Sequence, residues 1–491
     1  MFLRVRLTGI VLVMLGGCAV GPNYKGPPSA APHAENGGGF RRGDTGPIIQ
    51  VEPSDHWWLA LNDPLLTKLI GRAIAQSPDI RAAEARVLQA RANAHEQLAN
   101  LLPNGSVTGG YLYNRIPLGE VQQGIQDVGN RFHSGSVGNA VAQRVPDTVG
   151  LDLYDTNFDA TWEIDIFGGR RRGLERANRQ AESAEAALAD AHVRLAAQVA
   201  QAYVGLREAQ KRLALIIESA RLQQETLSLS EQRLALGTTS DVDVERLRTQ
   251  LEQTQANVDP LRASVDGSLN QLAVLLGLEP GELDANLRNA RAIPRPPSKV
   301  PIGDPAGVLR RRPDIRQAER SLAASNAQVG EAVANLFPRI VLFGNVGTIS
   351  SSTAVFGTGG SLLADVGPTL QWNILDFGRN IAQIRSAQAG TSEAIAQYQR
   401  TVLSALQDAE TALSRFAHQG SEVRKLESAD AAARKAAELT RQRNTAGTVS
   451  VIDLLDVERQ RLQTEQALVE AQGQLTNDYV SLQKALGLGW K

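Results

Sequence analysis

The stretch PDIRAAEARVLQARANAHEQLANLLP, residues 78–103, occurs twice in this chain. It returns without a gap at residues 313–338 as PDIRQAERSLAASNAQVGEAVANLFP, with 12 of 26 positions identical and an offset of 313 − 78 = 235. A second pair of segments follows, WEIDIFGG at 162–169 and WNILDFGR at 372–379, at an offset of 372 − 162 = 210. Because these units exceed the roughly 20–50 residues of a solenoid repeat, they are two tandem halves of a duplicated domain.

The smaller offset persists far beyond the second pair of segments, at Gly237/Gly447, Asp243/Asp453 and Gly277/Gly487. The difference of 235 − 210 = 25 residues assigns to the first copy a longer insertion between Pro103 and Trp162. We therefore expect a first repeat at 56–280, a proline-rich linker at 281–308 and a second repeat at 309–491.

Composition narrows the function classes. The 51 Lys and Arg residues nearly cancel the 52 Asp and Glu residues, so no net field attracts nucleic acid or acidic lipid. Aromatic residues make up only 4% of the chain, and long stretches crowded with Ala, Leu, Gln, Glu and Arg are typical of extended helices. A single cysteine excludes an internal disulfide and a thiolate zinc cluster.

The N-terminus has the pattern of an export signal. Arg4 and Arg6 precede a short apolar run at 7–15 that ends in Leu-Gly-Gly-Cys18, and this run is too short to span a membrane. Leu-Gly-Gly-Cys resembles the bacterial lipobox, which implies that residues 1–17 are removed and that Cys18 carries a covalent lipid, with palmitate among its acyl groups. An ordinary secretory signal with an incidental cysteine is the alternative. Residues 18–55, rich in Gly, Pro and Ala, are expected to form a lipid-anchored tether.

Two segments alternate apolar and polar residues with period two, the pattern of a strand with one apolar and one polar face. In residues 154–166 every even position except Thr156 is apolar and every odd position is polar, and residues 365–374 repeat this more briefly. With a partner run before each, the pattern predicts two hairpins, with strands at about 106–115 and 151–166, and at about 339–349 and 363–375.

The strands allow two interpretations. A half-buried strand of a soluble sandwich is the commoner one, but the polar face has many carboxylates and amides and few Lys or Arg, as a water-filled lumen would. Four strands cannot close alone in lipid, so a membrane-spanning barrel would need several chains. A dimer would supply eight strands and a trimer twelve. Pro368 removes a ladder donor and is expected at a bulge or a subunit edge.

Long helices are expected at about 170–236 and 241–276, and again at about 379–446 and 450–486. Apolar residues between Leu188 and Ala220 recur at a mean spacing close to 3.5, which predicts a coiled-coil seam. Gly237 and Gly447 suit the C′ position of the descending helices, and Ser240 or Asp241, and Ser450, suit the caps of the return helices. Pro260 has no proline counterpart in the second copy, so a kink is expected in the first copy only.

These motifs together, with CAVGPNYKGP, WEIDIFGGRRR, LRRRPDIRQAE and LLDVERQRL, resemble the outer membrane factor family of tripartite efflux systems, its NodT-like lipoprotein branch and its TolC-like and OprM-like relatives. The match runs through essentially the whole mature chain in the right order. It implies a mainly α fold with a transmembrane β part, in which a homotrimer forms a twelve-stranded barrel in the outer membrane and a twelve-helix tunnel in the periplasm. It also implies a periplasmic adaptor protein and an inner-membrane pump, of the RND type, as partners.

The same resemblance assigns roles at the helix tips. Asp453 and Asp456, with Asp243 in the first copy, match acidic rings at a periplasmic constriction, whereas acids favoured by the dipole of a helix N-terminus are the alternative. Adaptor contacts fall on the two turns, at Gly237, Thr238, Gly447 and Thr448. The triplet Arg170–Arg172 fits either a ring at the barrel-to-tunnel junction or a lipid phosphate contact.

No catalytic constellation, phosphate loop or His pair with metal-ligand spacing occurs in the sequence. We therefore expect no enzyme, no metal and no cofactor beyond the lipid on Cys18. The expected function is a passive exit duct for drugs or other small molecules. The alternatives are a duct for type I protein secretion or metal-ion export and, in another class, a non-conducting coiled-coil spacer.

Overall fold

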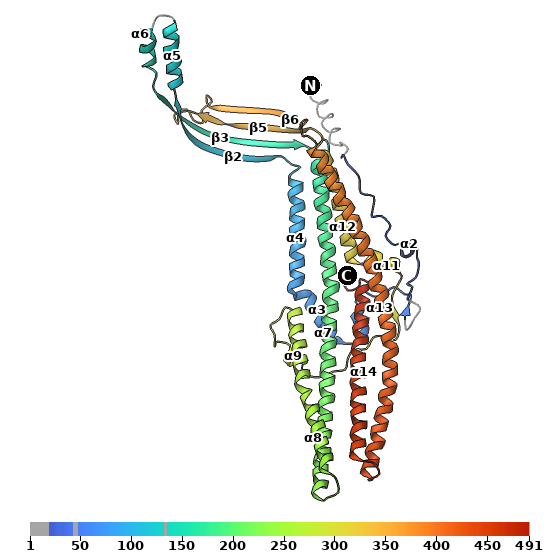
Figure 1. The fold of residues 1–491 in the computed structure, drawn as a ribbon. Helices are drawn as coiled ribbons and strands as arrows, with labels where there is room; N and C mark the ends of the chain where they lie inside the picture. The colour runs from blue at the N-terminus through green and yellow to red at the C-terminus, as the bar shows by residue number, and fades with distance from the viewer. Residues whose placement is uncertain (1–18, 43–47, 132–134, 491) are drawn as a thin grey trace. The chain divides into compact units, whose positions relative to one another are not determined.

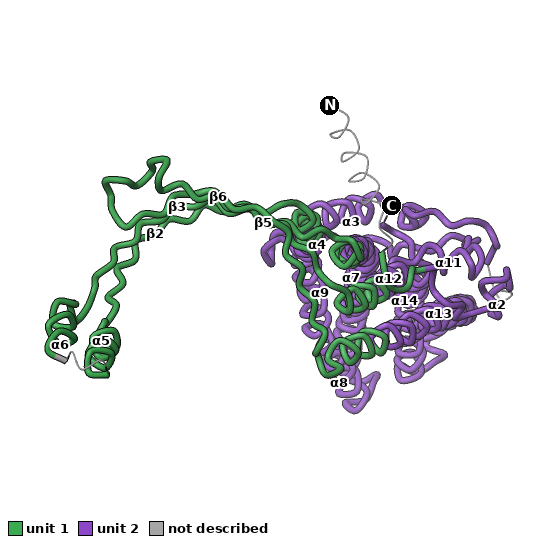
Figure 2. Tube along the Cα trace, turned by 90° about the horizontal axis from the view of Figure 1, so that it is seen from above, with its two compact units in different colours: residues 1–24, 92–177, 325–389 green, residues 25–91, 178–324, 390–491 purple. Residues whose placement is uncertain are grey.

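The computed structural model describes residues 19–42, 48–131 and 135–490, so the signal at 1–17 and Cys18 lie outside the described residues. The chain divides into two compact units, coloured in Figure 2: unit 1 comprises 1–24, 92–177 and 325–389, and unit 2 comprises 25–91, 178–324 and 390–491. Each unit is described by itself.

Unit 1 contains one antiparallel sheet of four strands. The strands are β2 (Asn104–Pro117), β3 (Thr148–Ile164), β5 (Arg339–Ser350) and β6 (Leu362–Gln371), in the order β2-β3-β5-β6 (Figure 1). The two predicted hairpins are thus joined, through β3 and β5, into a single sheet.

Two strands end earlier than the alternation predicts. β3 ends at Ile164 rather than 166 because the Asp165 carboxylate accepts hydrogen bonds from the amides of Arg170 and Arg171, which begin the next helix. β6 ends at Gln371 rather than 375, and the Asp376 carboxylate accepts the amides of Gly378 and Asn380. In both copies the period-two pattern therefore runs on into a helix cap.

The faces of the sheet differ as the sequence predicts. On the polar face the Asp159 carboxylate accepts hydrogen bonds from Thr108 Oγ1 at 3.2 Å and Asn345 Nδ2 at 2.5 Å, which links three strands. On the opposite face Phe158 lies between Val107 and Val346 in the register, and all three remain exposed in the single chain.

Pro368 lies on β6, an edge strand of this sheet. Its register with Leu342 on β5 is unbroken, so the bulge that the sequence allowed is not found there. An edge strand tolerates proline because it needs partners on one side only.

The insertion of the first copy forms two helices that the sequence did not predict. They are α5 (Gly119–Arg131) and α6 (Gly135–Ala142), between β2 and β3. A Cβ on Gly138 would lie only 2.8 Å from the Cα of Gly129, so the helices meet through glycine. Glycine is a poor helix former, so the composition of this segment does not indicate helices.

The two copies place their tryptophans alike. Trp162 Nε1 donates to the Leu101 carbonyl at 2.9 Å, and Trp372 Nε1 donates to the Leu336 carbonyl at 3.1 Å. Each acceptor belongs to the ANLLP or ANLFP end of the duplicated stretch. The stretch itself forms α4 (Pro78–Ala99) and α12 (Pro313–Ala334).

The long helices repeat to the residue. α7 (Gly169–Ala235) and α13 (Arg379–Thr445) each contain 67 residues, about 100 Å at 1.5 Å per residue. Their bounds differ by 379 − 169 = 210 and 445 − 235 = 210. Each is followed by an antiparallel return helix, so unit 2 contains two long helical hairpins (Figure 1).

The return helices differ as Pro260 predicts. In the first copy the helix is divided at Asn257 into α8 (Asp241–Ala256) and α9 (Val258–Leu275), whereas α14 (Val451–Ala485) is continuous. The break precedes Pro260 by three residues, because the proline ring clashes with the carbonyl four residues earlier and lacks its own N–H.

The core of unit 2 surrounds the middle of α7. It includes η1 (Trp57–Leu61) and α3 (Pro64–Gln76). Asp63 is the N-cap of α3, and its side chain accepts the amides of Leu65 and Leu66. The positions of the predicted seam from Leu195 to Ala209 are all buried here.

The described part of the segment at 18–55, expected to be a lipid-anchored tether, is partly packed, because Phe40 is 6% exposed and belongs to this core. The linker at 281–308 is also packed: Leu287, Val300 and Ile302 are fully buried. The two segments contribute α2 (Pro32–Glu35), α10 (Asp284–Leu287), α11 (Pro305–Arg311) and the parallel pair β1 (Ile48–Ile49) and β4 (Val300–Pro301). Burial of a few apolar side chains is enough to pack both segments against unit 2, although their composition is rich in Pro and Gly.

Both copies fasten the start of the duplicated stretch in the same way. Gly277 and Gly487, which follow the return helices, have φ values of 70° and 74°. A Cβ on Gly277 would lie 2.9 Å from the Gln76 carbonyl oxygen, and one on Gly487 would lie 2.7 Å from Arg312 Cγ.

In the described part of the chain, no helix is both long and apolar enough to cross a membrane.

Candidate functional site

The two hairpin tips have the same turn geometry. Gly237 and Gly447 both have φ of 72°, the left-handed conformation expected of a C′ glycine. The Thr238 amide donates to the Arg233 carbonyl at 2.9 Å and its Oγ1 to the same oxygen at 3.0 Å, and Thr448 makes both bonds to Arg443 at the same distances. The four predicted adaptor-contact residues therefore lie on two equivalent, well-defined turns.

The amides of Asp243 and Asp453 are bound by the serines that cap the two return helices. Ser240 Oγ accepts the Asp243 amide at 3.2 Å, and Ser450 Oγ accepts the Asp453 amide at 3.1 Å. A serine hydroxyl that accepts the amide of the third helical residue is an N-cap. Asp243 and Asp453 thus lie in the first turns of their helices, where the helix dipole favours acids, which was the alternative to the constriction.

Asp456 is placed differently. It forms an ion pair with Arg459 at 3.2 Å and lines a groove of about 590 Å³ between α8 and α14, together with Asp241 and Glu245. Neither Asp243 nor Asp453 lines this groove. The structure of the single chain therefore does not bring the three predicted constriction acids together.

The two hairpins differ in the contacts near their lower halves, although each has apolar contacts between its helices. Between α7 and α8, buried Leu227, Val244, Leu247 and Leu251 form an apolar cluster. Between α13 and α14, Glu465, whose side chain is 7% exposed, accepts from Arg434 at 2.5 Å and from Arg461 at 2.9 Å. Leu251 and Arg461 occupy equivalent positions, 210 residues apart, so one copy has a buried leucine where the other has a half-buried arginine.

The arginine triplet has structural partners that the sequence left open. Arg170 pairs with Glu163 at 2.8 Å and Arg171 with Asp165 at 3.2 Å. Arg172 is only 4% exposed and pairs with Glu175 at 2.7 Å. These contacts lie within unit 1, at the end of β3 and the start of α7.

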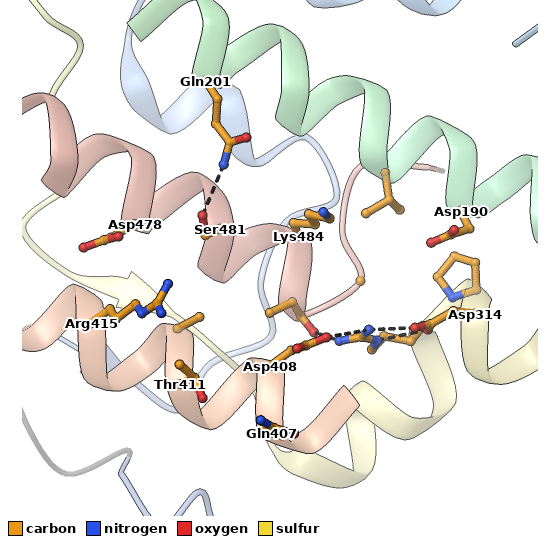
Figure 3. Close-up of a pocket in the computed structure, with 16 residues that line it drawn as sticks. Asp190, Gln201, Asp314, Gln407, Asp408, Thr411, Arg415, Asp478, Ser481 and Lys484 are labelled. Carbon is orange, nitrogen blue, oxygen red and sulfur yellow. Dashed lines mark hydrogen bonds and ion pairs between the residues drawn. The ribbon is translucent and has the colours of Figure 1, made fainter. Parts of the chain in front are cut away.

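Sequence reasoning missed a polar cavity of about 430 Å³ in unit 2, lined by α7, α13, α14 and the start of α12 (Figure 3). Arg312 holds Asp314 through two hydrogen bonds, at 2.6 and 3.0 Å, and reaches Asp408 on α13 at 3.3 Å. It also donates to the Ala485 carbonyl at 2.9 Å. The only signal in the sequence was the position of Arg312, directly before the duplicated stretch.

Asp478 also lines this cavity. Its residue is 5% exposed, and burial raises the pKa of its carboxyl above the ordinary value, although Gln474 donates a hydrogen bond to it at 2.7 Å and Arg415 lies nearby. Among the residues that the structure describes, no group of three or more His, Cys, Asp or Glu is placed to hold a metal ion.

Comparisons with known proteins agree over nearly the whole chain. The family model for outer membrane efflux proteins matches residues 69–278 and 305–488. Nodulation protein T of Rhizobium leguminosarum bv. trifolii is 30% identical over 479 residues, 97% of this chain and 96% of that protein. The antibiotic efflux pump outer membrane protein ArpC of Pseudomonas putida is 28% identical over 493 residues, 98% of this chain and 94% of that protein. The solved structure of the outer-membrane channel OprN is similar with a TM-score of 0.84 and 32% identity, covering 96% of this chain and 100% of that one.

Proposed function

Because the chain belongs to the outer membrane efflux protein family, and is accordingly an outer membrane channel component of an efflux pump, we propose that it acts as a passive trimeric exit duct. Drugs or other small molecules would enter from a periplasmic adaptor and an inner-membrane pump of the RND type and leave to the outside. The duct itself contributes a path and no chemistry.

The open sheet of unit 1 supports closure by several chains, and the family to which the chain belongs supports the number three. Its outer strands β2 and β6 each pair with a single neighbour, and an open sheet edge is not tolerated in lipid. One face is exposed and apolar at Val107, Phe158 and Val346, as a lipid-facing surface requires. Three chains of four strands each would close a twelve-stranded barrel, and their twelve long helices would continue it as a tunnel.

We further propose that Asp453, Asp456 and Asp243 form the periplasmic constriction. The ring would arise only from three copies, because a single chain supplies two of these acids on α14 and one on α8. The capping bonds of Ser240 and Ser450 do not oppose this role, because they use the backbone amides of Asp243 and Asp453. Asp456 stands where the first copy has Arg246, so a ring at this level would place carboxylates beside guanidinium groups.

The adaptor is proposed to contact Gly237, Thr238, Gly447 and Thr448. Two equivalent turns per chain give six equivalent tips in a trimer, and a repeated partner could bind all six in the same way.

Cys18 is proposed to carry the lipid, directly before the first described residue. Of the alternatives, a duct for secreted protein or metal ions would use the same wall, whereas a non-conducting spacer has no need of the two-faced sheet.

Intersubunit disulfides test the proposed barrel. One cysteine replaces Thr108 on β2, and a second is moved along β6 from residue 362 to 371, in a chain that otherwise contains only Cys18. If β2 of one chain pairs with β6 of the next, some positions will give disulfide-linked trimers on a non-reducing gel. Crosslinking confined to dimers, or absent at every position, would contradict the closed ring.

A further inference from the structure

The first described residues of the chain are bound by a single arginine of unit 1. Arg172 Nη2 donates to the Asn23 side-chain oxygen at 2.6 Å and to the Gly21 carbonyl at 3.4 Å, and its Nε donates to the Val20 carbonyl at 3.2 Å. The remaining nitrogen pairs with Glu175 at 2.7 Å. All three guanidinium nitrogens therefore have partners, and three of the four acceptors come from residues 20–23.

The backbone of this segment is also held. The Val20 amide donates to the Phe167 carbonyl at 3.0 Å, just after β3. Asn326 Nδ2, on α12, donates to the Pro22 carbonyl at 3.1 Å. The segment is thus bound along its length by the β3–α7 connection on one side and by α12 on the other.

Glycines make room for this contact. A Cβ on Gly21, whose φ is +87°, would lie 2.5 Å from the Cα of Gly330 on α12. A Cβ on Gly168, with φ +81°, would lie 2.6 Å from the Cα of Ala19. Separations this short are closed to any side chain, so the segment and the surface beneath it approach backbone to backbone.

The duplication supplies an internal comparison, because the chain has only one N-terminal segment to hold. At the positions equivalent to Arg172, Asn326 and Gly330 the other copy has Ala382, Arg91 and His95. Alanine offers no donor, and histidine would fill the space that Gly330 leaves. This binding surface therefore occurs in one of the two copies only. We call it the notch, and it consists of Phe167, Gly168, Arg172, Asn326 and Gly330.

The side chain of Arg172 is buried where it binds residues 20–23. Its side chain is 5% exposed, and removal of residues 20–23 would leave the Nε and Nη2 donors without their partners. A buried charged group without hydrogen-bond partners is costly. Release of the segment would either hydrate this guanidinium or, where it stays buried, leave its Nε and Nη2 donors unsatisfied.

We propose that Arg172 is a positioning residue that pins Ala19–Asn23 to the β3–α7 junction, so that the lipid-bearing residue is held at the level where the strands end. The proposal rests on the proposed lipidation of Cys18. Consecutive Cα atoms lie about 3.8 Å apart, and Ala19 itself contacts the notch. A lipid on Cys18 would then begin one residue away from the held segment. A tether of some 35 residues that was not held would not restrain the lipid in this way.

Hydrogen–deuterium exchange at the Val20 amide, in the lipidated protein reconstituted in nanodiscs, tests this proposal. The wild type should exchange this amide slowly. Arg172→Gln, which cannot hold all three acceptors, and Gly21→Ala, which blocks the approach from the segment side, should each speed its exchange by about tenfold or more, a change that corresponds to ~1.4 kcal/mol. Arg170→Gln is the matched control, because Arg170 pairs with Glu163 instead, and it should leave Val20 slow.

Slow exchange at Val20 in Gly21→Ala and in any folded Arg172→Gln protein would overturn the proposal. The unlipidated Cys18→Ser protein should keep Val20 slow, and fast exchange there would show that the lipid, not the notch, holds the segment. Planar-bilayer conductance separates the two proposals: the Gly21→Ala protein should conduct like the wild type. A wild type that fails to conduct would remove the exit duct, while the exchange data would still decide the notch.

Discussion

Ser450 Oγ lies 2.7 Å from Asp453 Oδ2 and 3.1 Å from the Asp453 amide nitrogen, so one hydroxyl donates to the carboxylate and accepts from the backbone of the same residue. In the first copy Ser240 accepts from the Asp243 amide in the same way, at 3.2 Å. The acid at the second tip therefore has a structural role that is separable from any role of its charge in a channel.

Ser450→Ala separates these roles. Loss of a serine cap costs about 1 kcal/mol, and amide exchange over the first turn of α14 should rise accordingly. Conductance should stay as in the wild type, because the Asp453 charge remains. A clear change in cation conductance on Ser450→Ala would mean that the cap, and not the carboxylate, sets the opening.

Asp453→Ala combined with Asp456→Ala tests the constriction. Removal of two carboxylates per chain should raise single-channel conductance in planar bilayers or reduce block by added divalent cations. Asp259→Ala is a suitable control, because that acid lies on α9 with a side chain 85% exposed. Unchanged conductance and unchanged block in the double variant would remove the constriction from this place.

Gly447 allows the adaptor contact to be told apart from turn strain. A Cβ at this position would meet nothing within 4 Å in the single chain, so only the φ of 72° opposes a side chain there. Asparagine tolerates this conformation and valine does not. If the adaptor lies against the turn, Gly447→Asn and Gly447→Val should both abolish crosslinking to it. If both variants still crosslink to the adaptor, the adaptor does not contact this turn. If only Gly447→Val loses the crosslink, the loss comes from distortion of the turn and not from a lost contact.

Glu465→Ala should loosen the second hairpin. It leaves Arg434 and Arg461 each without one of their carboxylate partners at the α13–α14 interface, and we expect a loss of roughly 1–3 kcal/mol. Gln255→Ala, the equivalent change in the first hairpin, should stay within about 0.5 kcal/mol, because Gln255 is exposed. Amide exchange of α14 and α8 measures both, and equal effects would show that the ion-pair network contributes nothing specific.

Asp478 gives a pH dependence with a defined sign. Burial raises the pKa of this carboxyl in the folded protein above its ordinary value of 3.8, so the folded state holds the proton more tightly than the unfolded state. Stability from this group is present at low pH and is lost as the pH rises through the raised pKa. Asp478→Asn should therefore gain thermal stability relative to the wild type as the pH is raised from about 4 to neutral. A stability difference that does not change with pH would contradict the assignment.

Much of this fold could be predicted because the sequence contains two copies of the same unit. The 210-residue offset returns as the bounds of α7 and α13, and Pro260 predicts the break at Asn257 that α14 lacks. Gly237 and Gly447 could be assigned to their turns because only a left-handed position makes glycine the preferred residue there. Local periodicity and local backbone chemistry determine these features, and both are visible in one sequence.

What could not be predicted depends on contacts between distant residues. Arg172 and Arg312 are embedded in runs of arginine, and only the packed structure shows that each is mostly buried among carbonyl and carboxylate partners. Phe40 belongs to a Gly- and Pro-rich segment whose composition predicts a tether, yet one large side chain finds the core of unit 2. The helices α5 and α6 were missed because glycine, which weakens each helix alone, lets the two approach closely.

Native mass and planar-bilayer conductance, measured on the same detergent-extracted preparation, test the proposed duct most directly. A chain whose sheet leaves β2 and β6 each with one neighbour should be extracted as a trimer that conducts ions. A monomer without conductance would contradict the exit duct and would favour a lipid-anchored spacer.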